Sequence, residues 1–398
     1  MPINKMKQLL LIFGLLSFGI SGCSPEPNAE ENNAPIEADD SEKIAQNQKE
    51  ESKAIAECYR IIYEQADAEG TLGTPDTMKK IIACLGDAGY AAVDEENQVD
   101  MVHSEQVKTF VGKVEKGESA ELLIICVAQE GGFTRFDFQT SNGEVQVTRS
   151  YLLWNGKTPE INSNESYPAA GWNYSEEGYL FFEQYHMPGY DGAPGYTALR
   201  VEHLDEKCRE LNRQYLLPIG YGSNNMFLTD WDEQDFTALD FYDLFHILYP
   251  RIYGVQTPYE ISYEGALYDV PGEEFEKVIR SYFQISLETL RSRTTYLADS
   301  QTYRYQTRGF VDWGWNPNVP YPEVVRYEEN PDGTLKLIVN AVYPAEKMSR
   351  AFSSEVVVRQ LPDGGVQYVS NHVIPSADNI EPSWYADRMS EEDTKLLP

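Results

Sequence analysis

Apolar side chains recur at helical spacing where the folded part of the chain begins. The first stripe consists of Ile55, Cys58, Tyr59, Ile62, Tyr63 and Ala66. After glycines near residue 70, Thr74 and Pro75 form a start signal for a second helix, because threonine caps helices and proline suits their first position. A connection this short makes the two helices antiparallel neighbours. A third helix is predicted from Ser104 to about residue 117.

The pattern changes from helix to strand at residue 120. Residues 121–127 are almost continuously apolar, and residues 133–138 and 144–154 alternate, with Asn142-Gly143 as a turn between them. Such runs joined by tight turns predict an antiparallel meander. A helix of about five turns, extending to Leu290, is predicted after Pro271-Gly272. Two Pro-Asp-Gly turns then mark two hairpins.

These elements predict an α+β fold with helices segregated from sheet. We expect an N-terminal helical hairpin plus antiparallel sheet at residues 53–265. We expect a C-terminal helix followed by an antiparallel β-meander at residues 266–398.

The first 23 residues have the form of an export signal. Lys5 and Lys7 precede an apolar run at residues 9–20, which is too short to span a bilayer. The next residues, Ile20-Ser21-Gly22-Cys23, resemble the lipobox of bacterial lipoproteins. The resemblance implies removal of residues 1–22 and lipid on Cys23, which would anchor the protein to the extracytoplasmic face of the cell membrane. The alternative is an ordinary secretory signal with an incidental cysteine.

The distribution of charge predicts an acidic tether after Cys23 and excludes nucleic acid as a partner. Residues 24–42 carry seven acidic side chains and no lysine or arginine, so we expect residues 23–52 to be a disordered tether. The whole chain has 64 acidic against 32 basic residues, a net charge of −32. Nucleic acid is therefore excluded as a partner, because phosphate binding needs clustered lysine and arginine. The overall pattern also looks like uncharacterised lipoproteins of gut-type Gram-positive bacteria, a resemblance that implies no activity.

Catalytic motifs are missing from the sequence. Gly156-Lys157-Thr158 lacks the earlier glycine of a phosphate loop, and none of the five histidines belongs to a His-Glu-x-x-His motif. We expect no cofactor and no metal. Two carboxylates could still hydrolyse a glycosidic bond, but the sequence cannot select a pair among so many acids.

Aromatic residues make up 12% of the chain and suggest a contact surface. Trp313, Trp315, Trp172 and Tyr190 lie in segments rich in glycine and proline, where exposed rings could stack on a ligand. The alternative is that these rings plug the ends of a sheet. The sequence thus favours a non-catalytic envelope protein that binds a glycan, peptide or protein partner. The alternative is an envelope hydrolase that uses a carboxylate pair.

Two cysteines occupy matching places on the two predicted N-terminal helices. Antiparallel packing around a loop near residue 72 brings Cys58 and Cys84 to one level. An exported protein can form disulfides, so a bridge between them is one interpretation. The other is that both are small buried residues.

Overall fold

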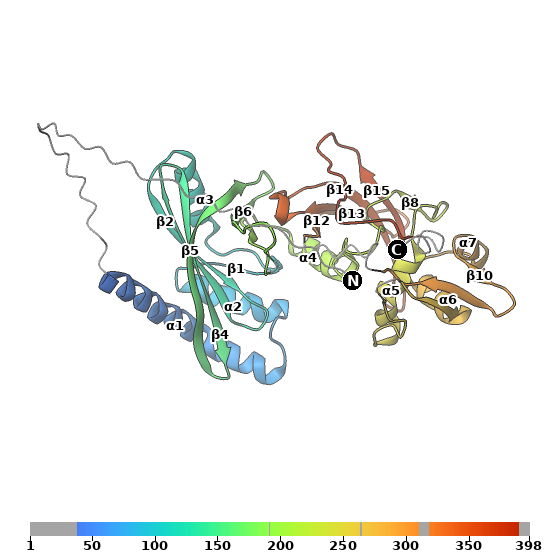
Figure 1. Cartoon of the computed structure of the whole chain (residues 1–398), viewed down its shortest axis with the longest axis horizontal. Coiled ribbons are helices and arrows are strands. Elements are labelled where there is room, and N and C mark those ends of the chain that lie inside the picture. Colours follow the sequence, from blue (N-terminus) through green and yellow to red (C-terminus); the bar gives the residue numbers. More distant parts are fainter. Residues whose placement is uncertain (1–37, 191, 263–264, 310–317, 390–398) are drawn as a thin grey trace, which may run out of the picture. The chain divides into compact units, whose positions relative to one another are not determined.

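The computed structural model describes residues 38–190, 192–262, 265–309 and 318–389. Its fold is mixed α+β with extensive antiparallel sheet (Figure 1). The chain divides into two compact units, residues 1–46 and residues 47–398. The second unit begins inside the first helix, α1 (Ala38–Glu69). This helix begins before residue 53, so residues 38–52, which composition assigned to the tether, are helical.

A seven-stranded sheet organises the first part of the larger unit. Its strands follow chain order, and all neighbours are antiparallel except the parallel pair β1–β2. Helix α3 connects the strands of that parallel pair. The remaining elements are α2 (Pro75–Asp87), β1 (Ala91–Asp94), α3 (Ser104–Glu115), β2 (Ala120–Val127), β3 (Phe133–Ser141), β4 (Glu144–Asn155), β5 (Thr158–Tyr174), β6 (Tyr179–Gln184) and β7 (Tyr196–Arg200).

Apolar side chains of β2 and β3 point to both faces of this sheet, so helices pack on both faces. Successive side chains of a strand point to opposite faces. Ile124 and Phe136 therefore pack with apolar residues of α3, whereas Ile125 and Phe133 pack with those of α1 and α2. The sheet lies between α3 on one face and α1 with α2 on the other (Figure 1).

Two smaller sheets and several helices form the rest of the unit. The five-stranded sheet has the order β12-β13-β14-β15-β8, and the three-stranded sheet has the order β10-β11-β9. Their elements are α4 (Glu206–Leu211), the π-helix η1 (Asn212–Leu216), β8 (Trp231–Asp232), α5 (Phe241–Tyr253), β9 (Leu267–Pro271), α6 (Gly272–Tyr282), α7 (Leu287–Ser292), β10 (Tyr296–Leu297), β11 (Thr302–Gln306), β12 (Tyr321–Glu329), β13 (Leu335–Val342), the 3-10 helix η2 (Pro344–Glu346), β14 (Ser353–Gln360) and β15 (Val366–Ile374).

The hydrophobic core around the two smaller sheets is largely separate from the core of the seven-stranded sheet. One cluster extends from Leu204 to Trp384, and the two larger clusters of the seven-stranded sheet end at Val201 and Leu152. A small cluster of Tyr179, Phe181 and Val342 connects the two parts. A buried ion pair joins the two parts. The Arg200 guanidinium of β7 lies 2.6 Å from the Glu323 carboxylate of β12, and both side chains are at most 6% exposed.

The predicted helix after Pro271 is interrupted. Helix α6 ends at Tyr282, because Phe283 takes an extended backbone conformation with φ −133° and ψ 134°. Ser286 then caps α7 by accepting a hydrogen bond from the Thr289 amide. Periodicity could not reveal this break, because Phe283, in the extended link after α6, and Leu290 of α7 both reach the same core.

Within the described ranges, no helix combines the length and the apolar character that a membrane crossing requires.

Candidate functional site

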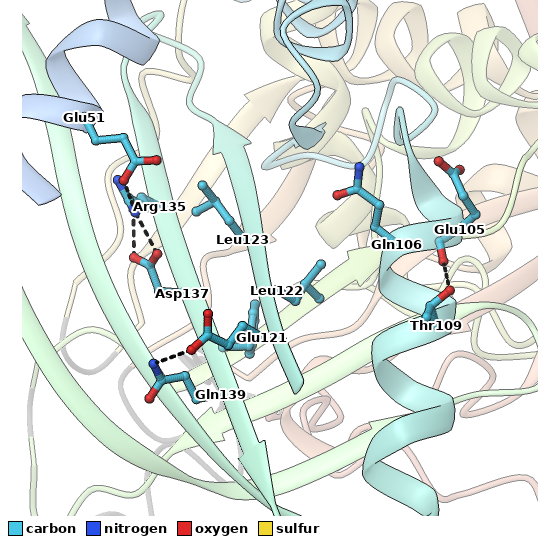
Figure 2. A pocket seen from close by; sticks show the side chains of 11 residues that line it. Glu51, Glu105, Gln106, Thr109, Glu121, Leu122, Leu123, Arg135, Asp137 and Gln139 are labelled. Carbon is cyan, nitrogen blue, oxygen red and sulfur yellow. Dashed lines mark hydrogen bonds and ion pairs between the residues drawn. The ribbon is translucent and has the colours of Figure 1, made fainter. Parts of the chain in front are cut away.

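A groove of about 560 Å³ runs along the edge of β2, between α1 and α3 (Figure 2). Its volume falls within the roughly 300–1,000 Å³ of typical ligand sites. Figure 2 shows Gln106 and Glu105 on α3 across the groove from Glu121 and Leu122 on β2. We call this feature the β2-edge groove. It is lined by Glu51, Glu105, Gln106, Thr109, Glu121, Leu122, Leu123, Arg135, Asp137, Phe138 and Gln139.

Arg135 holds the acidic side of the groove together. Arg135 lies on β3, and the residue is only 3% exposed. Its guanidinium donates two hydrogen bonds of 2.7 Å to Asp137 and one of 2.8 Å to Glu51 on α1. Burial alone would lower the pKa of Arg135, but hydrogen bonds and charge from Asp137 and Glu51 outweigh it and raise that pKa. The guanidinium therefore stays charged and fixes both carboxylates.

The other polar groups are fixed less tightly. The Gln139 amide donates to the Glu121 carboxylate at 3.3 Å, and both residues are exposed. On α3, Glu105 lies in the first helical turn, where its own backbone amide and His103 lower its pKa. The groove thus presents carboxylates from both sides.

A second hollow, of about 870 Å³, adjoins the groove and shares Glu121 and Gln139 with it. Trp172 of β5, one of the predicted ligand-contact residues, belongs to its lining. The indole is half-buried and packs against Phe110 and Phe138, with ring centroids 5.9 Å away in each case. Trp172 therefore serves the core as well as the surface.

The other expected site residues are dispersed or lie outside the described part. Tyr190 is 55% exposed and stacks on His186 at 4.0 Å, but it lines neither hollow. Cys23, Trp313 and Trp315 fall outside the described residues.

Cys58 and Cys84 lie side by side, as their sequence positions suggested. The Cys84 thiol donates to the Cys58 carbonyl oxygen at 3.0 Å, and both cysteines are free. Cys58 is exposed and Cys84 is half-buried.

A second concentration of charge is buried around Asp243 of α5. Arg308 donates to both of its carboxylate oxygens at 2.8 and 2.7 Å, and Arg388 also donates to it. Burial, followed by repulsion from Asp240, raises the pKa of Asp243 to about 6, against the two arginines. A cavity of about 240 Å³, also lined by His246, adjoins this cluster and is smaller than a typical ligand site.

In the described part of the chain, no three or more histidine, cysteine, aspartate or glutamate side chains are grouped so as to hold a metal ion.

Comparison with known protein families gives one match. A family described as of unknown function, DUF6070, matches residues 45–388, which includes the groove and the buried charge cluster. The chain belongs to the DUF6070 family. No curated protein and no solved structure matches this DUF6070 chain.

Sequence reasoning missed the groove of this DUF6070 member, although β3 contained a signal for it. In that strand Arg135, Asp137 and Gln139 alternate with buried phenylalanines. A charged row on a strand that is covered on both faces needs partners from another element. Those partners, Glu51 and Glu121, come from α1 and β2 and could not be selected by spacing.

Proposed function

We propose that this protein is exported, anchored by lipid on Cys23, and binds a ligand at the extracytoplasmic face of the cell membrane. In this proposal an N-terminal helical hairpin with its sheet carries the ligand site. A C-terminal helix with its β-meander completes the folded part. The ligand is a glycan, a peptide or a protein segment of the envelope.

The β2-edge groove is the observation that carries the binding role. Its size suits a ligand, and two of its carboxylates, those of Glu51 and Asp137, are held in place by the buried Arg135. Pre-set polar groups in a hollow favour recognition, because little side-chain freedom is lost on binding.

The oxygens of the groove favour binding over hydrolysis. Glu51 and Asp137 both bind Arg135, and Glu121 binds Gln139. A hydrolase needs two carboxyl groups that face each other across the substrate with oxygens free to react. The acids of the groove are engaged in contacts that maintain its shape.

The alternative, an envelope hydrolase, has one supporting observation. The carboxyl group of Asp243 has a raised pKa of about 6, suitable for proton transfer, and lies beside a cavity with His246. Against it, both oxygens of Asp243 accept hydrogen bonds from Arg308. If the wild type releases product from envelope glycans or peptides and Asp243→Asn does not, the hydrolase would be favoured.

Two measurements test the proposal. Cys23→Ser should move the protein from the membrane fraction to the medium and abolish incorporation of a labelled fatty acid. A variant that keeps both membrane binding and lipid label would contradict the anchor. For the ligand, the purified full-length protein is screened against immobilised envelope glycans and peptides, and failure to retain any of them would contradict the binding role.

A further inference from the structure

Half of β2 lacks a strand neighbour on one side. Strand β3 pairs with the whole of β2, from Ala120 to Val127. Strand β1 pairs only with its second half, from Ile124 onward. Within the described part of the chain, residues 120–123 therefore have a strand neighbour on the β3 side alone, and their other side borders the β2-edge groove.

The orientation of the backbone in this stretch follows from one hydrogen bond. The Glu95 amide, just beyond β1, donates to the Val127 carbonyl oxygen at 2.9 Å, so Val127 presents its backbone groups to the β1 side. Residues two apart on a strand present these groups to the same side. Leu123 and Glu121 thus direct backbone groups toward the groove beyond the end of β1.

An open edge of this kind can accept an additional strand. Main-chain hydrogen bonds to an exposed edge supply affinity, and alternate side chains of the added strand supply specificity. Helix α3 lines the other side of the groove with Gln106 and Thr109, so an added strand would lie beside β2 with α3 next to it (Figure 2).

The charge of the groove selects the occupant. Its lining carries a single guanidinium, from Arg135, and four carboxylates, from Glu51, Glu105, Glu121 and Asp137. A second copy of this chain, with a net charge of −32, would be repelled, as would the acidic residues 24–42. Charged side chains commonly protect sheet edges from pairing with like-charged copies. The same charges attract a basic strand.

We infer that the β2-edge groove binds an extended segment of a partner protein as an added strand along residues 120–123, with lysine or arginine at alternate positions. This inference rests on the proposed binding role and names its ligand. The basic side chains face Glu51, Glu121 and Asp137, while the intervening residues face α3.

The test uses the purified full-length protein and a dye-labelled heptapeptide with lysine at every second position and threonine between. We expect saturable binding by fluorescence anisotropy. Glu121→Lys should weaken binding at least tenfold, because it reverses the charge at the open edge. Glu381→Lys, at an exposed acid away from the groove, is the matched control and should change affinity less than twofold.

An N-methylated peptide of the same charge separates strand addition from general attraction to an acidic protein. It cannot donate the main-chain hydrogen bonds, so it should bind at least tenfold more weakly. Slower hydrogen exchange at the Glu121 and Leu123 amides with the unmodified peptide would support the inference.

Three outcomes would overturn the inference. They are equal binding of both peptides, equal effects of the two lysine variants, and binding of glycans but of no peptide. The last of these would leave the proposed binding role intact, whereas retention of neither class of ligand would remove the role as well.

Discussion

The guanidinium of Arg135 donates to both carboxylate oxygens of Asp137, at 2.7 Å each. The two residues are two positions apart on β3 and therefore lie on one face of the sheet. The same guanidinium binds Glu51 of α1 at 2.8 Å. A local pair within a strand thus also ties a distant helix to the sheet and defines one side of the groove.

Removing Arg135 should destabilise the fold. In Arg135→Met, Asp137 and Glu51 lose their partner, and breaking a buried ion pair from one side costs about 3–5 kcal/mol. Because both acids retain some contact with solvent, we expect a fall of about 3 kcal/mol in the free energy of unfolding, measured by urea denaturation. The control is Arg304→Met, whose exposed pair with Asp269 should contribute less than about 1 kcal/mol. Similar losses in the two variants would contradict this role of Arg135.

The Cys84 thiol lies 3.0 Å from the Cys58 carbonyl oxygen, and we predict that the two cysteines form a disulfide in the exported protein. Closing the 26-residue separation would raise the free energy of unfolding by about 3 kcal/mol on the chain-entropy estimate. Intact-mass analysis after alkylation in denaturant without reductant should then find two thiols, from Cys126 and Cys208. Four alkylated thiols in the mature protein would rule the bridge out.

His246 should make the protein less stable in mild acid. Burial, followed by the positive charge of Arg388, lowers the pKa of His246, so the native state binds its proton less readily than the unfolded chain. The unfolded state then takes up the proton below about pH 6.5, and stability falls as the pH drops. The contribution has a slope of at most about 1.4 kcal/mol per pH unit.

The contribution of His246 is isolated by comparing the wild type with His246→Asn between pH 7 and pH 5. The variant should lose less stability over this range. His372→Asn, at an exposed histidine, should behave as the wild type. An equal loss in the wild type and His246→Asn would show that another group causes the acid sensitivity.

Trp313 and Trp315 remain predicted to face solvent as part of a contact surface. Replacing each with phenylalanine should remove fluorescence that acrylamide quenches readily. Trp231 and Trp384, at most 2% exposed, are the matched controls, and their replacement should remove quencher-resistant fluorescence. Strong resistance to the quencher at both Trp313 and Trp315 would contradict the prediction.

Features that depend on neighbouring residues were predictable from the sequence. The apolar run of β2 and the alternation of β3 predicted strands, and both are present. Asn142 and Gly143 form the predicted turn with φ values of 55° and 83°, a conformation that asparagine and glycine tolerate. Thr74 caps α2 as expected.

The groove could not be predicted, because its parts come together from distant positions. Glu51 and Arg135 are 84 positions apart, and any of 64 acids could have been the partner. The short parallel strand β1 likewise leaves no distinctive pattern, yet its length decides how much of β2 stays open.

The sequence by itself determined the mixed fold, the main strands and several helix starts, because capping, turn conformation and alternation act over a few residues. The tertiary structure alone decided where the core divides, where α6 ends and which charges meet. The hydrophobic effect has no direction, so an apolar pattern specifies that a face is buried without specifying what buries it. The pairing of Arg135 with Glu51 and the open edge of β2 exist only once α1 and β1 have packed against the sheet.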